Sequence, residues 1–441
     1  MTPTKPTFKE ALQFWLKLGF ISFGGPAGQI AIMHNFLVEK KCWISDGKFL
    51  HALNYCMLLP GPEAQQLATY IGWLMHGLKG GLVAGILFVL PSTFILLSLS
   101  LIYVTFGQLA SVSAVFSGLK PAVVAIVIGA LIKIGKKSLS GWSHHFVALA
   151  SFICIFFLKV PFPFIIGGAI IGGFVWQWLF PQLFIAKKVE KKQDWEETDY
   201  YLNLLSPIAG SGVHGLRIMK QIVTGALFWG IPLGLFFCIA SHFLFWKTLV
   251  LFFTKAALVT FGGAYAVLPY VAQKSVETYH WLSAGQMIDG LALGETTPGP
   301  LIMVLAFVGF MAGYHTYAGA LWAGTAGLLT TTFYTFLPSF LFIFIGAPLV
   351  EKTQENPVVK RILGIVTAAV VGVVLNLTLY LGEAVIWPQG WSLNSPDWLS
   401  LGWIIISFIG LQFFKINMIW WIGISGTMGF IWHLATQILG F

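Results

Sequence analysis

Residues that could bind an anion occur in two blocks of the chain, separated by a constant spacing of 238 residues. The first block contains Lys17, Ser22, Gly24-Gly25 and Pro60-Gly61-Pro62. The second contains Lys255, Thr260, Gly262-Gly263 and Pro298-Gly299-Pro300. Backbone N–H groups, hydroxyls and ammonium groups are the donors with which proteins bind oxyanions. The repeated blocks therefore predict that two related units contribute to one anion site.

The glycines and prolines of these blocks interrupt apolar sequence that otherwise favours helix. Gly costs about 1 kcal/mol and Pro about 3 kcal/mol relative to Ala inside a helix. At membrane depth such breaks persist only inside protein or beside an aqueous cavity. A helix that restarts there presents unpaired N–H groups and a partial positive charge, and Pro62 and Pro300 suit its first position. We expect four such ends to converge near the midplane; the alternative is that the breaks only form tight turns or allow close helix packing.

Two lysines and two hydroxyls accompany the breaks. Lys17 and Lys255 each lie seven residues before a glycine pair, which places them on the same helix face as Gly24 and Gly262. They could bind the anion, or extend along the helix to the membrane surface. Ser22 and Thr260 could donate to an oxyanion, or bond back to their own helix.

Two carboxylates are candidates for proton coupling. Glu295 belongs to the segment Gly294-Glu295-Thr296-Thr297-Pro298, inside the second copy of the break, and the two threonines add hydroxyls to the predicted anion site. A carboxylate at membrane depth can gain and lose a proton. Glu63 follows Pro62 in the first turn of a helix, where an acid stabilises the helix dipole without any further role. Either carboxylate could instead be neutralised by Lys17 or Lys255.

The elements that must position these residues are membrane-spanning helices. Hydrophobic residues make up 57% of the chain and charged residues 9%, with a mean hydropathy of +0.83. Apolar stretches of the length that a span needs cover residues 80–104, 112–133, 144–159, 162–181, 217–241, 318–346, 362–382, 398–413 and 417–439. The fold class is therefore an all-α polytopic membrane protein, and we expect no removable signal peptide.

The composition also argues against other classes of protein. The net charge of +9 comes from lysines between spans, which points to lipid headgroups and not to nucleic acid. The cysteines and histidines lack the spacing of a metal site, so we expect neither a metal nor a cofactor. No motif of a hydrolase or metalloenzyme is present, so we do not expect an enzyme.

Charge placement predicts how the halves are oriented. Lys133, Lys136 and Lys137 follow the span around Gly118, whereas Lys360 and Arg361 precede its counterpart around Gly364. Positive residues mark the cytoplasmic side, so equivalent helices run in opposite directions and the repeat is inverted. We expect a first repeat over 1–183, a charged cytoplasmic loop over 184–216, an unpaired linking helix over 217–241 and a second, inverted repeat over 242–441. The N-terminus is then cytoplasmic and the C-terminus external. The broken segments either cross once as interrupted helices or form re-entrant hairpins whose tips meet near the midplane.

The motifs resemble those of the chromate ion transporter family, in its long two-domain form. The resemblance rests on Phe20-Ile21-Ser22-Phe23-Gly24-Gly25-Pro26, Leu59-Pro60-Gly61-Pro62-Glu63-Ala64, Phe261-Gly262-Gly263 and Glu295-Thr296-Thr297-Pro298-Gly299-Pro300, and covers the chain except the 184–216 loop. It implies an inner-membrane protein that exports chromate, with sulfate as a competitor, driven by the proton-motive force. Partners are then the small oxyanion and membrane lipids, with a homodimer as an assembly the chain could form. An anion channel or a permease for another small anion is the alternative.

Overall fold

The computed structural model describes residues 5–23, 25–179, 200–203, 215–239, 241–353, 357–388, 390 and 396–439. Within these ranges every regular element is a helix. The first half contains α1 (Phe8–Ile21), α2 (Gly25–His34), the π-helix η1 (Asn35–Lys40), α3 (Asp46–Cys56), α4 (Glu63–Phe106), α5 (Ala110–Ser138), α6 (Trp142–Phe156) and α7 (Phe162–Leu179). After α8 (Gly215–Ile239), the second contains α9 (Phe243–Leu258), α10 (Ala264–Gln273), η4 (Lys274–Thr278), α11 (Ala284–Thr296), η5 (Leu301–Met303), α12 (Val304–Thr316), α13 (Leu321–Thr353), α14 (Pro357–Ile386), α15 (Trp398–Gln412) and α16 (Met418–Leu439).

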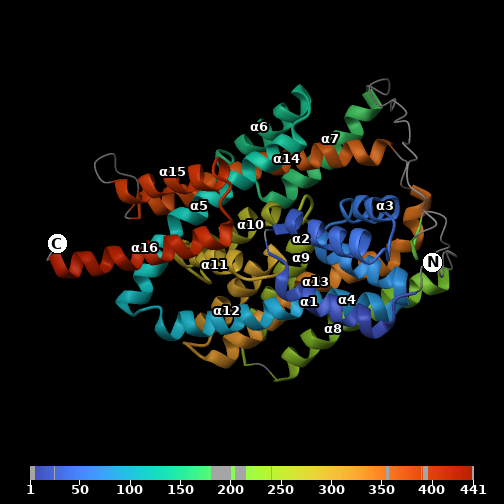
Figure 1. Cartoon of the computed structure of the whole chain (residues 1–441), viewed down its shortest axis with the longest axis horizontal. Helices are drawn as coiled ribbons and strands as arrows, with labels where there is room; N and C mark the ends of the chain where they lie inside the picture. The colour runs from blue at the N-terminus through green and yellow to red at the C-terminus, as the bar shows by residue number, and fades with distance from the viewer. Residues whose placement is uncertain are drawn as a thin grey trace.

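Each of the nine predicted apolar stretches coincides with a helix, which confirms the all-α polytopic fold class. Six helices are long and apolar enough to cross a membrane within the described residues, namely those in α4, α5, α8, α13, α14 and α16. These helices run roughly along the long axis of the molecule, with α1 starting towards one end and α16 ending at the other (Figure 1).

The two halves repeat the same order of elements in detail. Both contain a π-helical turn at the same place, and a serine caps the next helix in each, Ser45 before α3 and Ser283 before α11. Cys42 and His280, which are 238 residues apart, both have a φ of 51°. The long α4 contains a sharp reversal at His76 and Gly77, where the second half has a connection between α12 and α13. The 63–76 segment of α4 thus corresponds to η5 and α12, and its 78–106 segment to α13.

The broken segments are hairpins whose two arms run antiparallel. In hairpin 4, formed by α11 with η5 and α12, Gly290 lies against Phe307 and Gly294 against Val304. In hairpin 2, formed by α3 and the 63–76 segment, the rings of Tyr55 and Tyr70 are 5.3 Å apart. An arm such as α1, with 14 residues, is about 21 Å long and cannot cross a hydrocarbon core of about 30 Å.

Hairpins 1 and 3 follow the same plan. Hairpin 1 consists of α1, α2 and η1, and the stacked rings of Phe14 and Phe36 lie 4.1 Å apart between its arms. Hairpin 3 consists of α9, α10 and η4, and Phe252 lies 5.3 Å from Tyr270. Of the two forms that the sequence left open, the structure has the re-entrant one.

The central contact between the halves is an antiparallel helix pair. Gly85 of α4 lies against Phe340 of α13, and Gly81 lies against Phe344, so the numbering rises along one helix as it falls along the other. Because these helices occupy equivalent places in the repeat, their antiparallel packing is the relation that an inverted repeat requires. The sides of the membrane on which their ends lie stay a prediction from the charge pattern.

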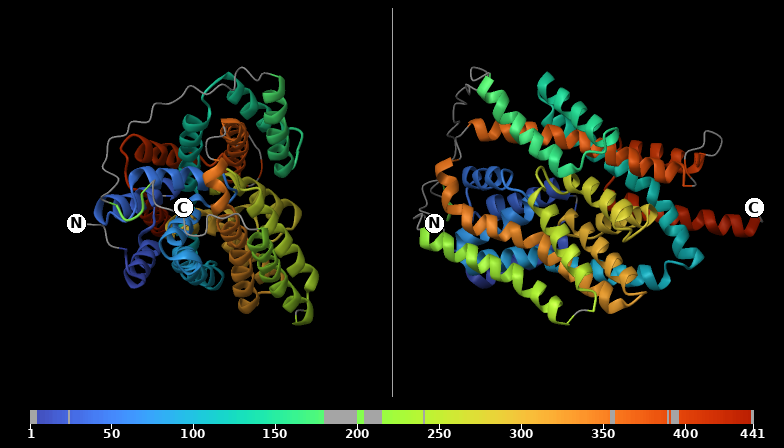
Figure 2. Two further views of the ribbon diagram at one scale, coloured as in Figure 1. Left: turned by 90° about the vertical axis from the view of Figure 1, so that its right-hand side faces the viewer. Right: turned by 180° about the vertical axis from the view of Figure 1, so that it is seen from behind.

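The last two helices of each half pack on the other half. Helices α6 and α7 lie against α14, while α15 and α16 lie against α5 (Figures 1 and 2). Close approach needs glycine: Gly372 of α14 meets the backbone of Ala148, and Gly118 of α5 meets that of Ser425 and Gly429. This exchange of helices is reciprocal, so neither half is complete alone.

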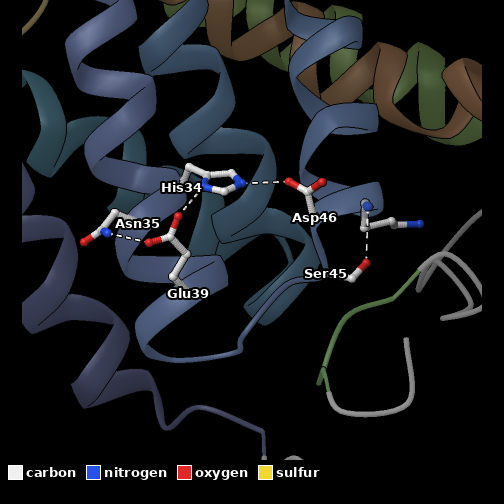
Figure 3. A network of polar contacts seen from close by, with 6 residues as sticks. His34, Asn35, Glu39, Ser45 and Asp46 are labelled. Carbon is white, nitrogen blue, oxygen red and sulfur yellow. Dashed lines mark hydrogen bonds and ion pairs between the residues drawn. The ribbon is translucent and has the colours of Figure 1, made fainter. Parts of the chain in front are cut away.

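A polar network joins hairpins 1 and 2 at their open ends, away from the tips (Figure 3). His34 Nε2 lies 2.7 Å from Asp46 Oδ1, and His34 Nδ1 lies 3.4 Å from Glu39 Oε1. Asn35 donates to the other oxygen of Glu39 at 2.6 Å. The described part of the charged loop adds backbone bonds here, since Ser45 N–H donates to the carbonyl of Leu202 at 2.8 Å. These contacts hold the open ends of hairpins 1 and 2 together.

Candidate functional site

The tips of the four hairpins meet in pairs, and each pair joins the two halves. Gly61 N–H, in the tip of hairpin 2, donates to the carbonyl of Thr260 in the tip of hairpin 3 at 2.7 Å. Gly299 N–H, in the tip of hairpin 4, donates to the carbonyl of Ser22 in the tip of hairpin 1 at 2.7 Å. Gly61 is equivalent to Gly299, and Ser22 to Thr260, so the two bonds are related by a local two-fold axis. The breaks of each half are thus satisfied by the other half, as the apolar surroundings require.

Serines that sequence reasoning did not include complete this junction. A side chain at Gly61 would meet Ser339 Oγ at 2.5 Å, and one at Gly299 would overlap Ser92 Oγ. The Ser92 hydroxyl donates to the carbonyl of Pro298. Their signal was present, because Leu90-Pro91-Ser92 recurs as Leu337-Pro338-Ser339, but only the fold shows that each serine reaches the tip of a hairpin from the opposite half.

Ser92 and Ser339 differ in their hydrogen bonds, and several polar side-chain atoms near hairpin 2 have no partner. The Pro60 carbonyl, which corresponds to that of Pro298, accepts from the Gln66 amide at 2.8 Å. Among the described residues, Ser339 Oγ has no hydrogen-bond partner, nor do Thr335 Oγ1, one helical turn away, and the side-chain oxygens of Gln65 and Gln66. All four side chains are at most 2% exposed. Buried polar atoms without partners are rare in proteins and indicate where water or a ligand binds.

The predicted hydroxyl donors Ser22 and Thr260 are committed elsewhere. Ser22 donates to the carbonyl of Leu18 and Thr260 to that of Ala256, each at 2.6 Å. Thr296 and Thr297 likewise donate to Leu293 in their own helix, at 2.8 and 2.6 Å. These hydroxyl protons are therefore not available to an anion in this structure, and the carbonyls of Ser22 and Thr260 serve as the acceptors for Gly299 and Gly61.

The glycine pairs leave open space at the starts of two helices. Gly25, the first residue of α2, has a φ of +67°, and its equivalent Gly263, which precedes α10, has a φ of +94°. A side chain at either position would meet no atom within 4 Å. Gly262 also has a positive φ, of +81°, whereas Gly24 lies outside the described residues. Neither α4 nor α10 has a side chain that caps its first N–H groups. Such helix starts can accept an anion.

The helix starts at the junction are accompanied by an equal number of helix ends. Helices α1, α3, α9 and α11 end in the same four tips where α2, α4, α10 and η5 begin. The C-terminal ends of these helices carry partial negative charge, which offsets the partial positive charge of the helix starts. The electrostatic potential at a point between the tips therefore depends on which helix ends are nearest to it. Gly61 and Gly299 N–H are already bonded, and Pro62 and Pro300 have no N–H. The start of α10, which has no side-chain cap, therefore offers backbone donors more clearly than the proline tips do.

The carboxylates differ in environment. Glu295 is 5% exposed and accepts from the hydroxyl of Tyr265, in the first turn of α10, at 2.7 Å. Glu63 is half-buried in the first turn of α4. In the repeat, Glu295 corresponds to Met57 and Glu63 to Leu301, so each carboxylate is present in one half alone.

The lysines do not join the junction. The side chains of Lys17 on α1 and Lys255 on α9 are both exposed, on the outward faces of their hairpins. Helix α9 ends at Leu258, before Gly262, so the helical spacing expected to place Lys255 and Gly262 on one face does not extend to the glycine pair.

Comparison with known proteins identifies the family. The family model described as chromate transporter matches residues 9–174 and 247–430, which cover nearly all of the four hairpins and most of the helices that follow them. The chain belongs to the chromate transporter family. It is 30% identical over 386 residues to the chromate transport protein of Cupriavidus metallidurans, covering 86% of this chain and 84% of the relative.

Further relatives cover most of the chain as well. A probable chromate transport protein of Synechococcus elongatus is 29% identical over 86% of this chain and 85% of its own length. An uncharacterised transporter of Methanocaldococcus jannaschii is 26% identical over 97% of this chain and 94% of its own length. No solved structure matches the chain. The protein is therefore a multi-pass membrane transporter.

Glycine at the two tips is predicted to be essential for folding. Gly61 and Gly299 have φ angles of +128° and +105°, and a side chain at either would meet a serine. Backbone in this region costs a non-glycine residue about 1–3 kcal/mol, before the overlap is added. Gly61→Ala and Gly299→Ala should each lower the melting temperature of the purified protein or its folded yield.

The control is Gly168→Ala in α7, where a side chain would meet nothing within 4 Å. Adding Ser339→Ala to Gly61→Ala should recover part of the loss, because it removes the nearest overlapping atom. Wild-type melting of both single tip variants would show that the tips do not pack as described.

Proposed function

We propose that the protein exports a tetrahedral oxyanion, chromate and also sulfate, across the inner (plasma) membrane. The observation that carries this proposal is the junction of the hairpin tips, which combines the uncapped start of α10, open glycine positions and the unpartnered hydroxyls of Ser339 and Thr335. Donors of this kind suit an oxyanion that presents oxygen in every direction. Chromate comes from the family and from the names of the relatives, and sulfate from its similar size and charge.

The substrate-binding groups that we propose are the tips themselves. They comprise the segments around Gly24-Gly25, Pro60-Gly61-Pro62, Gly262-Gly263 and Pro298-Gly299-Pro300, joined by Ser339 and Thr335 of α13. Ser22, Thr260, Thr296 and Thr297 act in this proposal through their backbone, as supports for the tips. We do not include Lys17 and Lys255 in the binding site. Their side chains are exposed, which favours the alternative that they extend to the membrane surface.

We further propose the inverted topology, with the N-terminus cytoplasmic and the C-terminus external. In this arrangement hairpins 1 and 2 open to the cytoplasm and hairpins 3 and 4 to the outside, with their tips meeting at the midplane. The boundaries predicted above at 183, 216 and 241 then separate two repeats, a cytoplasmic loop and the linking α8. A site between oppositely directed hairpins can be opened to one side at a time, which distinguishes a transporter from a channel.

The membrane potential can drive such export without further coupling. Each negative charge that leaves an inside-negative cell gains about 2.3 kcal/mol per 100 mV, and a dianion gains about twice that. In proteoliposomes loaded with labelled chromate or sulfate, a potential that is negative inside should accelerate efflux. Ser339→Ala should lower the apparent affinity about tenfold, as expected for one hydrogen bond to an anion, while Lys17→Met serves as a control with wild-type affinity.

The flux assay can contradict the proposal in two ways. Flux that does not respond to the potential would argue against net movement of negative charge. Electrogenic flux of a small monovalent anion at rates far above those of chromate and sulfate would favour the alternative, an anion channel or a permease for another anion.

Proton coupling, if it contributes, is assigned first to Glu295. Its carboxylate is buried next to the tips and has a single hydroxyl partner, so a change in its charge would alter the site directly. Glu295→Gln should abolish the acceleration of flux by a pH gradient and leave exchange of anion for anion largely intact. Glu63→Gln should change flux less, because a first-turn acid mainly stabilises the helix dipole, by about 0.3–1 kcal/mol.

The two variants are compared side by side under an imposed pH gradient and under an imposed potential. An essential Glu63 with a dispensable Glu295 would reverse this ranking. Wild-type behaviour of both would leave the potential as the driving force.

A further inference from the structure

A buried ion pair lies outside the junction of the tips and joins the two halves at a different level. Asp289, on α11 of hairpin 4, receives a hydrogen bond from the Tyr103 hydroxyl of α4 at 2.9 Å. Its other oxygen lies 3.7 Å from the ammonium of Lys120 on α5. Six residues along α11 separate Asp289 from Glu295, which places the ion pair about 9 Å from the tip of hairpin 4 along that helix.

A charged lysine side chain within an apolar helix costs free energy unless it is paired or lies beside water. Lys120 lies ten residues after the start of α5, an apolar helix of membrane-spanning length. Charged side chains within such helices are rare and normally mark a substrate or ion pathway. In the other half the equivalent positions hold Val366 for Lys120 and His51 for Asp289, so the pair is not a feature that duplication copied.

The pair is incompletely bonded. At 3.7 Å the contact between Lys120 Nζ and Asp289 Oδ1 is beyond hydrogen-bond distance, and this oxygen is buried without a hydrogen-bond partner. The Lys120 side chain is 31% exposed, whereas that of Asp289 is 7% exposed and therefore almost enclosed. Lys120 also lies near the first turn of α11, where a side chain at Gly285 would be 3.7 Å from its Nζ. The positive end of α11 adds to the charge of the ammonium there.

The chemistry of these donors matches an oxyanion. A hydroxyl donates to one oxygen of the Asp289 carboxylate and an ammonium lies 3.7 Å from the other, and the same two donors can bind two oxygens of a tetrahedral anion. Tyr103 is positioned for this by its ring, which packs edge-on against Phe116 at 5.1 Å and Phe307 at 5.4 Å. We propose that Lys120 and Tyr103 form a second binding station for the transported oxyanion, external to the tips, which Asp289 occupies when no anion is bound. This inference rests on the proposed function, since it assigns a further station to the same substrate.

The station is tested by binding, separately from flux. Sulfate and chromate are titrated into the purified protein in lipid nanodiscs. Asp289→Asn removes the charge that competes for Lys120 and should tighten anion binding about tenfold. Lys120→Met in the Asp289→Asn background should abolish that gain, and Tyr103→Phe should reduce it while preserving the ring contacts. Lys247→Met, which removes an exposed lysine of α9, is the matched control and should change nothing.

A merely structural ion pair gives different results. It would survive exchange of the charges, so Lys120→Asp with Asp289→Lys would melt and bind anion like the wild type, which would overturn the proposal. Unchanged or weaker binding by folded Asp289→Asn would also overturn it. If Asp289→Asn does not fold, the anion affinity of Tyr103→Phe tests the station instead. Wild-type affinity in Tyr103→Phe would contradict the proposal.

Failure of the station and failure of the proposed function can be distinguished. Normal wild-type flux with no effect of Asp289→Asn on affinity removes the station alone. Tighter binding in Asp289→Asn without electrogenic flux of the wild type removes the proposed function alone.

Discussion

The structure depends on one constraint: backbone polar groups at breaks between apolar helices must find partners inside the protein. Four breaks in apolar sequence leave N–H and carbonyl groups without helical partners at the hairpin tips. The chain satisfies them by crossing between the halves, with Gly61 bonded to Thr260 and Gly299 bonded to Ser22, each at 2.7 Å. The reciprocal packing of α6 and α7 on α14, and of α15 and α16 on α5, follows the same principle at larger scale. Each half folds against the other, so the junction of the tips is fixed by both.

The two pairs of tips carry different side chains, although their backbones are related by the repeat. Gln29 donates to the carbonyl of Gly299 at 2.6 Å, whereas Val267 takes its place in the second half. Ser92 is bonded while its equivalent Ser339 is not, and Glu295 with Tyr265 has no counterpart pair. The two halves share one frame, and these single substitutions make the two pairs of hairpin tips chemically different. Asp289 and Lys120 extend that difference beyond the tips.

The sequence predicted those features that depend on composition and local spacing. Apolar length predicted the helices, and the recurrence of Gly24-Gly25 and Pro60-Gly61-Pro62 predicted the paired breaks. Features that depend on contacts with residues distant in the sequence could not be predicted from the sequence. The hydroxyls of Ser22 and Thr260 have both a local carbonyl and a central site within reach, and the local bond formed. Lys17 has a predictable helix face, but which face turns inward depends on α4, against which α1 packs. The surroundings of Ser339, and the pairing of Asp289 with Lys120, depend on helices that are distant in the sequence and could not be predicted from local spacing.

The central claim is that equivalent hairpins enter the membrane from opposite sides. Cys42 and His280, equivalent residues with the same backbone conformation, lie at the open ends of hairpins 1 and 3. With Cys56, Cys154 and Cys238 replaced by alanine, a membrane-impermeant thiol reagent is applied to inverted and right-side-out vesicles carrying either Cys42 or His280→Cys alone. The account predicts that Cys42 is labelled only from the cytoplasmic side and the cysteine at 280 only from the external side. Labelling of both positions from the same side would contradict it.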